Sequence, residues 1–302
     1  MLKILFVNWW DNGSSDFFLN YCKKYIYRKV KISDDKPHII FYSVFGNKNK
    51  IIDCVKNNKN AVNIFFIGES TIHKYYEHYE DYLLNIVDIS LGFKYIDHPK
   101  YIRFPLWITY INFADSNMGE HRSNFDNLLT KKFKNKTNFC CMLSNHDHFN
   151  TRTKIFEELN KYKKIDSAGN LKNNHPKIGK DQKYKYRFLE NYKFNICCES
   201  LIEKGYVTEK IFDSLICGCI PIYIVNDIND NIEDEILNQD FILKFTNNNI
   251  NDVINKIKYI DSNHKYFNRY FNKDILKKNA IKIVHQKYNK LKELILKDFK
   301  KQ

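Results

Sequence analysis

Apolar runs recur along the chain, and polar segments long enough for a helix separate most of them. Eight runs have the length of a buried strand: "KILFV" at 3–7, "IIFYSVF" at 39–45, "VNIFFI" at 62–67, "IVDISLGF" at 86–93, "NFCCML" at 138–143, "KFNICC" at 193–198, "IPIYIV" at 220–225 and "FILKF" at 241–245. Continuous apolar runs are typical of strands that covering helices bury on both faces. The pattern therefore predicts an α/β fold with parallel sheets.

One long polar segment divides these runs into two groups of four. It extends from Asp115 to Thr137, "DSNMGEHRSNFDNLLTKKFKNKT", and shows no clear core pattern. We place the domain boundary inside it, so that residues 1–118 form one domain and residues 119–302 form the other. The expected architecture is two Rossmann-like, doubly wound domains that face each other across a cleft.

The composition agrees with a globular protein. Of 302 residues, 43% are hydrophobic and 16% aromatic, which excludes an intrinsically disordered chain. No stretch approaches the ~20 apolar residues that span a bilayer. The opening "MLKILFVNWWDNG" lacks the length and cleavage site of a signal peptide, so we interpret it as a buried strand and expect a cytoplasmic protein.

Positive charge is concentrated near the C-terminus. The chain carries a net charge of +14, and residues 264–302 contain twelve Lys and Arg against three acidic residues. Apolar side chains recur at helical spacing from Ile281 to Ile295, which predicts a basic amphipathic helix. Such a helix either packs on the core with its lysines in solvent or contacts an anionic membrane surface. No signature of nucleic-acid binding accompanies the charge.

Cysteines and possible metal ligands give no recognisable metal site. The eight cysteines include the vicinal pairs Cys140–Cys141 and Cys197–Cys198, and none forms paired C-x2-C motifs. We expect them to be buried, reduced and inert. "HDH" at 146–148 and "NDINDN" at 226–231 contain metal-binding residue types, but both are interpreted as polar loops, so no metal is expected.

Two strand–loop–helix units place a cation in the first turn of a helix. Arg152 follows "NFCCML" in a helix that should begin near Thr151, and Lys210 follows "KFNICC" in a helix expected over Thr208–Cys217. A cation in the first turn opposes the helix dipole. A bound anion would reverse that penalty, because the free N–H groups and the cation would both face it. The repetition favours a diphosphate site, although Walker A and G-x-G-x-x-G motifs are missing.

A carboxylate ends one strand of the first group. Glu69 directly follows Gly68 after "VNIFFI", at the carboxyl end of the expected strand. Ligands of open parallel sheets bind at this end. Glu69 is therefore a candidate general base, and a solvent-exposed or capping acid is the alternative.

The segment "YKFNICCESLIEKGYVTEKIFDSLICGCIPIYI" at 192–224 resembles the donor-binding signature of the α1,3-fucosyltransferases, glycosyltransferase family ten. "FVNWWDN", "NIFFIGES" and "DISLGFKYIDHPKYIRFPLWITY" are similar to the bacterial branch of that family, and "LSNHDHFNTRTKIFEEL" matches its arginine-bearing helix. The resemblance implies a GT-B fold that holds GDP-fucose in the second domain and an acceptor oligosaccharide in the first.

The resemblance also implies roles for particular residues. Arg152 and Lys210 would contact the donor diphosphate, and Glu69 would be the general base. Further donor contacts would come from Glu199, Ser200, Tyr206, Thr208 and Glu209. The chain departs from the family pattern at Ser200, where asparagine is usual, and at Val225, where glycine is usual, so Val225 is expected to narrow the pocket.

The reaction implied is metal-independent transfer of L-fucose with inversion, α1,3-linked to a GlcNAc-type sugar. Two alternatives remain open: a GT-B enzyme that uses another nucleotide sugar, and a non-catalytic protein that binds glycans or nucleic acid. Only the enzymes would release a free nucleoside diphosphate from a nucleotide sugar.

Overall fold

The computed structural model describes residues 1–10, 15–112, 123–124, 136–179, 181–271 and 274–299. The chain divides into two compact units. Unit 1 comprises Met1–Arg122 together with Ile281–Gln302, and unit 2 comprises Ser123–Ala280. The boundary that the sequence predicted at residues 118 and 119 lies outside the described residues.

Unit 1 is built on a six-stranded parallel sheet. Its strand order is β2-β1-β3-β4-β5-β6. The strands are β1 (Leu2–Val7), β2 (Val30–Ile32), β3 (Ile39–Tyr42), β4 (Val62–Phe66), β5 (Ile89–Gly92) and β6 (Tyr101–Arg103). Short elements complete the unit: η1 (Glu77–Tyr79), η2 (Leu106–Tyr110) and β7 (Ile111–Asn112).

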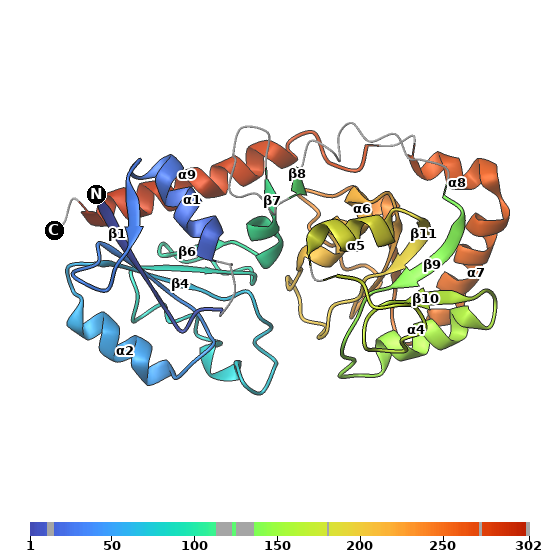
Figure 1. Ribbon diagram of the computed structural model, residues 1–302, viewed down its shortest axis with the longest axis horizontal. Coiled ribbons are helices and arrows are strands. Elements are labelled where there is room, and N and C mark those ends of the chain that lie inside the picture. Colours follow the sequence, from blue (N-terminus) through green and yellow to red (C-terminus); the bar gives the residue numbers. More distant parts are fainter. Residues whose placement is uncertain (11–14, 113–122, 125–135, 180, 272–273, 300–302) are drawn as a thin grey trace. The chain divides into compact units, whose positions relative to one another are not determined.

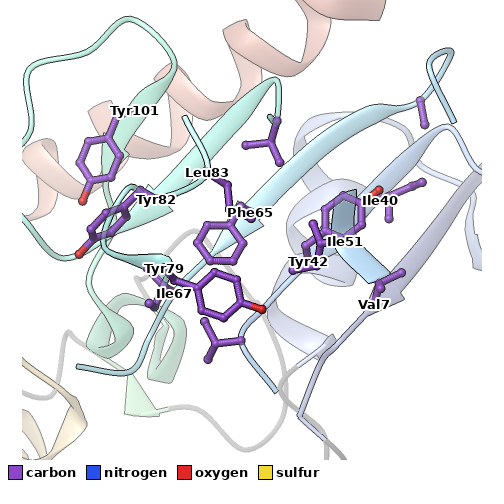
Figure 2. Packing of buried hydrophobic residues seen from close by; sticks show 13 residues of the cluster. Val7, Ile40, Tyr42, Ile51, Phe65, Ile67, Tyr79, Tyr82, Leu83 and Tyr101 are labelled. Carbon is purple, nitrogen blue, oxygen red and sulfur yellow. The ribbon is translucent and has the colours of Figure 1, made fainter. Parts of the chain in front are cut away.

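Helices cover both faces of this sheet. Helices α1 (Ser15–Tyr25) and α9 (Ala280–Phe299) lie against one face, and α2 (Lys48–Asn57) lies against the other (Figure 1). On the α2 side, Ile40, Tyr42 and Phe65 pack with Ile51 and Tyr79 (Figure 2). This two-sided burial is the physical reason for the continuous apolar runs.

Unit 2 repeats the topology with a five-stranded parallel sheet of order β10-β9-β11-β12-β13. Its strands are β9 (Asn138–Met142), β10 (Ile165–Ser167), β11 (Tyr192–Ile196), β12 (Ile220–Ile224) and β13 (Leu243–Phe245). The remaining elements are β8 (Ser123–Asn124), α4 (Thr151–Asn160), α5 (Gln182–Leu189), α6 (Glu209–Ile216), η3 (Gln239–Phe241), α7 (Ile250–Ser262) and α8 (His264–Phe271).

The chain reverses its direction of travel across this sheet after β10. It steps outward from β9 to β10 and then returns past β9 to β11. Because parallel crossovers are right-handed, the helices before and after the reversal lie on opposite faces. Accordingly α5 and α6 lie on one face, and α4 and α7 on the other (Figure 1). The reversal makes the carboxyl ends of β9 and β11 the topological switch point, where ligands of such sheets bind.

The predicted α/β class and parallel sheets are confirmed, and each of the eight predicted runs contains a strand. Within the two parallel sheets, three strands were not predicted: β2, β6 and β10. Each is three residues long and lies at a sheet edge. Among the described residues, no helix is both long and apolar enough to cross a membrane.

The C-terminal helix belongs to a different unit from the one that the sequence suggested. The predicted second domain ran to residue 302, whereas residues 281–302 group with unit 1. The Tyr21 hydroxyl of α1 donates to the Tyr288 carbonyl of α9 at 2.7 Å. Val284, Tyr288, Leu291 and Ile295 are fully buried. The apolar face of α9 is therefore occupied by protein, as in the first of the two alternatives weighed for this helix.

Helix α6 ends in a hydrogen-bonded motif that requires a left-handed residue. Gly218 has φ 71°, and its N–H donates to the Leu215 carbonyl at 3.0 Å. The Cys219 N–H donates to the Ser214 carbonyl at 2.8 Å. These are the two bonds of a Schellman motif, and glycine adopts the required conformation without steric cost. The motif turns the chain directly from α6 into β12.

We expect Gly218→Ala to destabilise unit 2 by about 1–2 kcal/mol, because a Cβ is unfavourable in the left-handed region. The measurement is a thermal unfolding scan, in which Tm should fall by a few degrees. Gly218→Asn is the matched control and should lose less, because asparagine tolerates this conformation. Equal Tm values for Gly218→Ala and the parent protein would contradict the assignment.

Candidate functional site

Arg152 lies at the switch point of unit 2 and connects the two loops that diverge there. It is the second residue of α4, and its side chain is buried. Its Nε and Nη2 donate to the Cys198 carbonyl at 3.1 and 2.6 Å, and its Nη1 donates to the His146 carbonyl. His146 belongs to the loop after β9, and Cys198 to the loop after β11. The guanidinium therefore fixes the backbone of both loops.

The position of Arg152 in the first turn is confirmed, but its environment was not foreseen. The sequence left open whether it meets an anion or is exposed and tolerated, and it is only 3% exposed. Three of its five N–H groups have backbone acceptors among the residues that the structure describes.

The "HDH" loop contributes to the start of α4. Asp147 accepts a hydrogen bond from the Thr153 N–H at 2.7 Å, so its carboxylate satisfies one of the free N–H groups of the first turn. His146 and His148 are exposed, and their rings lie 6.4 Å apart. Across the described parts of the chain, no group of three or more His, Cys, Asp or Glu residues could hold a metal ion.

Glu199, just beyond β11, is the centre of a buried hydrogen-bond network. Its carboxylate is 3% exposed and accepts bonds from the Thr208 N–H at 2.8 Å, the Thr208 hydroxyl at 2.8 Å and the Lys210 ammonium at 3.0 Å. The Tyr223 hydroxyl lies 3.5 Å away. A buried carboxylate is stable only with donors of this kind. Glu199 thereby fixes the first turn of α6 against the end of β11.

Two oxygen atoms of this network, one from Glu199 and one from Thr208, hold the Lys210 ammonium. Its Nζ also donates to the Thr208 hydroxyl oxygen at 2.8 Å. Burial alone would lower the pKa of Lys210, but Glu199 and Glu209 outweigh that effect and raise it. The ammonium therefore stays charged. Among the described residues it makes two hydrogen bonds, and it also forms an ion pair with Glu209 at 3.9 Å. A permanently charged donor at a helix N-terminus suits a phosphate.

The segment between β11 and α6 is shaped by a tight turn. The Tyr206 N–H donates to the Glu203 carbonyl at 3.0 Å, and Gly205 has φ 84°, which a side chain would disfavour. Tyr206 is buried, and Ser200 is half-buried. Val225 continues the β12–β13 pairing, since its N–H donates to the Phe245 carbonyl at 2.9 Å. Its side chain is buried at the end of β12.

A second charged cluster beside α6 was missed by the sequence reasoning. Lys185 of α5 forms an ion pair with Asp213 and lies 3.6 Å from Glu209. The Tyr186 hydroxyl donates to Asp213 at 2.8 Å. Burial raises the pKa of Asp213 in spite of Lys185. One signal was available, because Asp213 interrupts the apolar face of "KIFDSLI", but nothing in "QKYKYRFL" marks Lys185.

Glu209 lies between the two clusters. Burial would raise its pKa, but Lys210 and Lys185 outweigh that effect and lower it to about 2. An ionised carboxylate in the first turn of α6 also suits the helix dipole. Glu209 is thus an acceptor, never a proton donor, at neutral pH.

Glu69 belongs to unit 1 and is described there by itself. It is half-buried just beyond β4, as predicted. Burial raises the pKa of the neighbouring Tyr76, and the Glu69 charge raises it further, so that phenol stays protonated beside the carboxylate. A Cβ on Gly68 would come within 2.8 Å of the Leu106 Cδ1, so the Leu106 side chain would have to move to admit it.

Known families match both units of the chain. The model of the C-terminal part of glycosyltransferase family 10 (fucosyltransferase) matches residues 131–294, more than half of the chain. The chain belongs to glycosyltransferase family 10. A second model, the N-terminal domain of alpha-(1,3)-fucosyltransferase FucT, matches residues 4–110 of this family 10 protein.

Curated relatives agree with this membership. The family 10 protein is 26% identical to the alpha-(1,3)-fucosyltransferase FucT of Helicobacter pylori over 93% of its own length and 60% of that relative. A putative fucosyltransferase of Acanthamoeba polyphaga mimivirus is 25% identical over 75% of this chain and 36% of that protein. The human 4-galactosyl-N-acetylglucosaminide 3-alpha-L-fucosyltransferase 9 is 26% identical over 44% of this chain and 36% of that protein. The chain therefore spans no more than 60% of the length of these relatives.

Solved structures share the fold. A crystal structure of alpha1,3-fucosyltransferase superposes with a TM-score of 0.67 at 20% identity, and the match covers 97% of this chain and 90% of that one. A crystal structure of alpha1,3-fucosyltransferase with GDP-fucose gives a TM-score of 0.66. The predicted two-sheet glycosyltransferase fold is thereby confirmed.

The low pKa of Glu209 gives the site a pH dependence. The pKa of Glu209 in the folded protein, about 2, lies below the ~4.3 of an unfolded glutamate. Ionised Glu209 therefore stabilises the fold fully at pH values above about 4.3. The stabilisation is lost as the pH falls through about 2. We expect the stability advantage of the parent protein over Glu209→Gln to shrink between about pH 5 and pH 2, measured by denaturant unfolding. The exposed Glu235 provides a control, Glu235→Gln, that should show no such change. A constant advantage at all pH values would contradict the role of Lys185 and Lys210.

Proposed function

We propose that this protein transfers L-fucose from GDP-fucose to a hydroxyl of an acceptor glycan, in an α1,3 linkage to a GlcNAc-type sugar. The observation that carries the proposal is the pair of cations at the switch point of unit 2, Arg152 and Lys210, within a region that matches the family 10 model. The solved relatives bound to GDP-fucose and to GDP support the choice of donor.

The donor diphosphate would bind at the first turns of α4 and α6. Within the described residues, two N–H groups of Arg152 have no backbone acceptor. Lys210 has a third N–H group beyond its hydrogen bonds to Glu199 and Thr208, with the Glu209 carboxylate 3.9 Å from its Nζ. These donors and the helix N–H groups would bind the anion together. Glu209, ionised and on the same turn, would accept hydrogen bonds from ribose or fucose hydroxyls. Tyr206 and Ser200, in the loop before α6, would complete the donor pocket.

Bond cleavage would develop charge at both ends of the scissile bond. The anomeric carbon of fucose would become oxocarbenium-like while the leaving GDP gains negative charge. Lys210 and Arg152 would stabilise that charge from fixed positions, without a metal ion. Glu69 would take the proton from the acceptor hydroxyl on the opposite face, which inverts the configuration. Glu199 would act by holding Thr208 and Lys210 in place.

Contact with an anionic membrane surface stays a prediction, and α9 limits its form. Four apolar side chains of α9 are fully buried: Val284, Tyr288, Leu291 and Ile295. Lys277, Lys278 and Lys282, around the start of the helix, are exposed. We propose that any such contact is electrostatic and therefore sensitive to salt. The cytoplasmic location also stays a prediction of the sequence.

GDP should raise the Tm of the protein, and UDP should not do so at the same concentration. A ligand that binds only the folded state at 100 times its Kd adds about 2.7 kcal/mol of stability. The measurement is a thermal-shift titration with both nucleotides. Stabilisation by UDP alone would favour a different nucleotide sugar, and stabilisation by neither would favour the non-catalytic alternative.

Glu69→Gln and Lys210→Met should fail in different ways. Glu69→Gln removes the base, so kcat should fall by about 10²–10⁴-fold while GDP binding is unchanged. Lys210→Met should weaken GDP binding as well as slow transfer, because it removes a contact to the diphosphate. The measurements are GDP calorimetry and release of GDP from GDP-fucose with acceptor, with and without EDTA.

Each outcome of this comparison is informative. Near-full turnover of Glu69→Gln would place the base elsewhere. A loss of GDP binding in Glu69→Gln equal to that in Lys210→Met would contradict the proposed division of roles. Complete, metal-reversible loss of activity in EDTA would show that a metal holds the diphosphate.

A further inference from the structure

Unit 2 contains a pocket beside its edge strand that the proposed reaction does not use. It has a volume of about 610 Å³ and lies between η3, β13 and helices α7 and α8. This volume is within the range of small-molecule sites. None of its lining residues belongs to the network of Arg152, Glu199 and Lys210. We call it the β13 pocket.

Positive charge dominates the lining of the β13 pocket. Lys244, Lys256 and Arg269 line it, together with one carboxylate, Asp240. Neither Lys256 nor Arg269 forms an ion pair with any residue that the structure describes. Lys256 and Arg269 are exposed, and both line the same concavity, where one anion could bind to both.

Lys244 is the most constrained of these cations. It lies on β13, and its Nζ donates to the Asp230 carbonyl at 2.7 Å and to the Asn231 side-chain oxygen at 3.4 Å. Partial burial lowers the pKa of Lys244, although Asp230 and Asp227 act in the opposite direction. A bound anion would favour its charged form and so gain affinity.

Aromatic rings form the other part of the lining. Phe241 and Tyr270 pack at 6.4 Å and 78°, and Tyr266 and Tyr270 pack at 6.0 Å and 67°. Burial, with the neighbouring Tyr266 and Asp240, raises the pKa of Tyr270 to about 12, so its hydroxyl remains protonated. The rings stand edge to face. Their planes are inclined by 78° and 67°, so these rings do not form a parallel slot that would enclose a flat base.

We propose that the β13 pocket binds an anionic saccharide, a sugar that carries a carboxylate or a phosphate. The cations would bind the acidic group, the aromatic rings would contact the C–H face of the sugar, and the Tyr270 hydroxyl would bond to a sugar oxygen. This site is additional to the donor site and does not depend on the donor being GDP-fucose. It would give a glycan-modifying protein a second contact with charged glycans, away from the reacting hydroxyl.

The test is a calorimetric titration of the full chain in saturating GDP, so that an anion site at α4 and α6 is already occupied. The probes are sialyllactose for the carboxylate, galactose 6-phosphate for the phosphate and lactose as the neutral reference. We expect at least one anionic probe to bind more tightly than lactose and to weaken with added salt. The comparison of the two anionic probes identifies the acidic group.

Two variants on α8 connect the binding to the pocket. Arg269→Gln should weaken binding of the anionic probe about threefold to tenfold, because it removes a charged hydrogen-bond donor. Lys265→Gln is the matched control, since Lys265 is an exposed cation of the same helix outside the lining. Tyr270→Phe should also weaken binding if its hydroxyl contacts the sugar.

Several results would overturn the proposal. These are equal binding of lactose and the anionic probes, equal loss in Arg269→Gln and Lys265→Gln, and lack of binding by every probe at millimolar concentration. Binding that is seen only without GDP would assign the anion to the donor site instead. A failed proposal here would leave GDP release from GDP-fucose unchanged, so the two proposals can be judged separately.

Discussion

The carboxylate of Glu199 is buried, and its stability depends on donors that come from the helix that follows it. Thr208 and Lys210 supply them, and Tyr223 lies close by on the neighbouring strand. An unpaired carboxylate in this position would cost several kcal/mol, so the loop after β11 and the first turn of α6 cannot separate without a large penalty. The same contacts fix the ammonium of Lys210 at the N-terminus of α6. Arg152 fixes the loop after β9 in a similar way, but it donates to neutral backbone carbonyl groups. The proposed diphosphate site therefore exists before any ligand binds.

How far the fold could be predicted depended on where each strand lies in its sheet. Interior strands such as β4 and β11 are covered on both faces, and their sequences record that burial as continuous apolar runs. Edge strands β2 and β10 lack this signal: β2 is "VKI", with exposed or half-buried residues, and β10 is "IDS". Edge strand β13 was found only because "FILKF" packs against α7 and stays apolar. The unit that contains α9 could not be predicted, because an amphipathic helix does not indicate which surface covers its apolar face.

The candidate site was predictable in its positions more than in its interactions. Periodicity placed Arg152 and Lys210 in first turns, and the structure agrees. Periodicity could not show that Arg152 donates three N–H groups to backbone carbonyls, because the sheet topology alone brings those carbonyls together. Lys185 was missed for the same reason: its importance comes from Asp213 and Glu209 on another helix, and a lysine in a lysine-rich segment carries no mark of that. The sequence assigned Glu199 to the donor, which stays a prediction, and gave no sign of its hydrogen bonds to Thr208 and Lys210.

The return of α9 to unit 1 has a consequence for synthesis on the ribosome. Unit 2 is one continuous stretch of sequence, so all of its strands are available as soon as residue 280 has emerged. Unit 1 is interrupted, and the Tyr21 hydroxyl cannot find its acceptor at Tyr288 until almost the whole chain has been made. Domains usually fold in the order in which they are synthesised. Here the unit that is translated first is completed last. Until the C-terminal residues emerge, the face of its sheet that α9 covers stays without that helix.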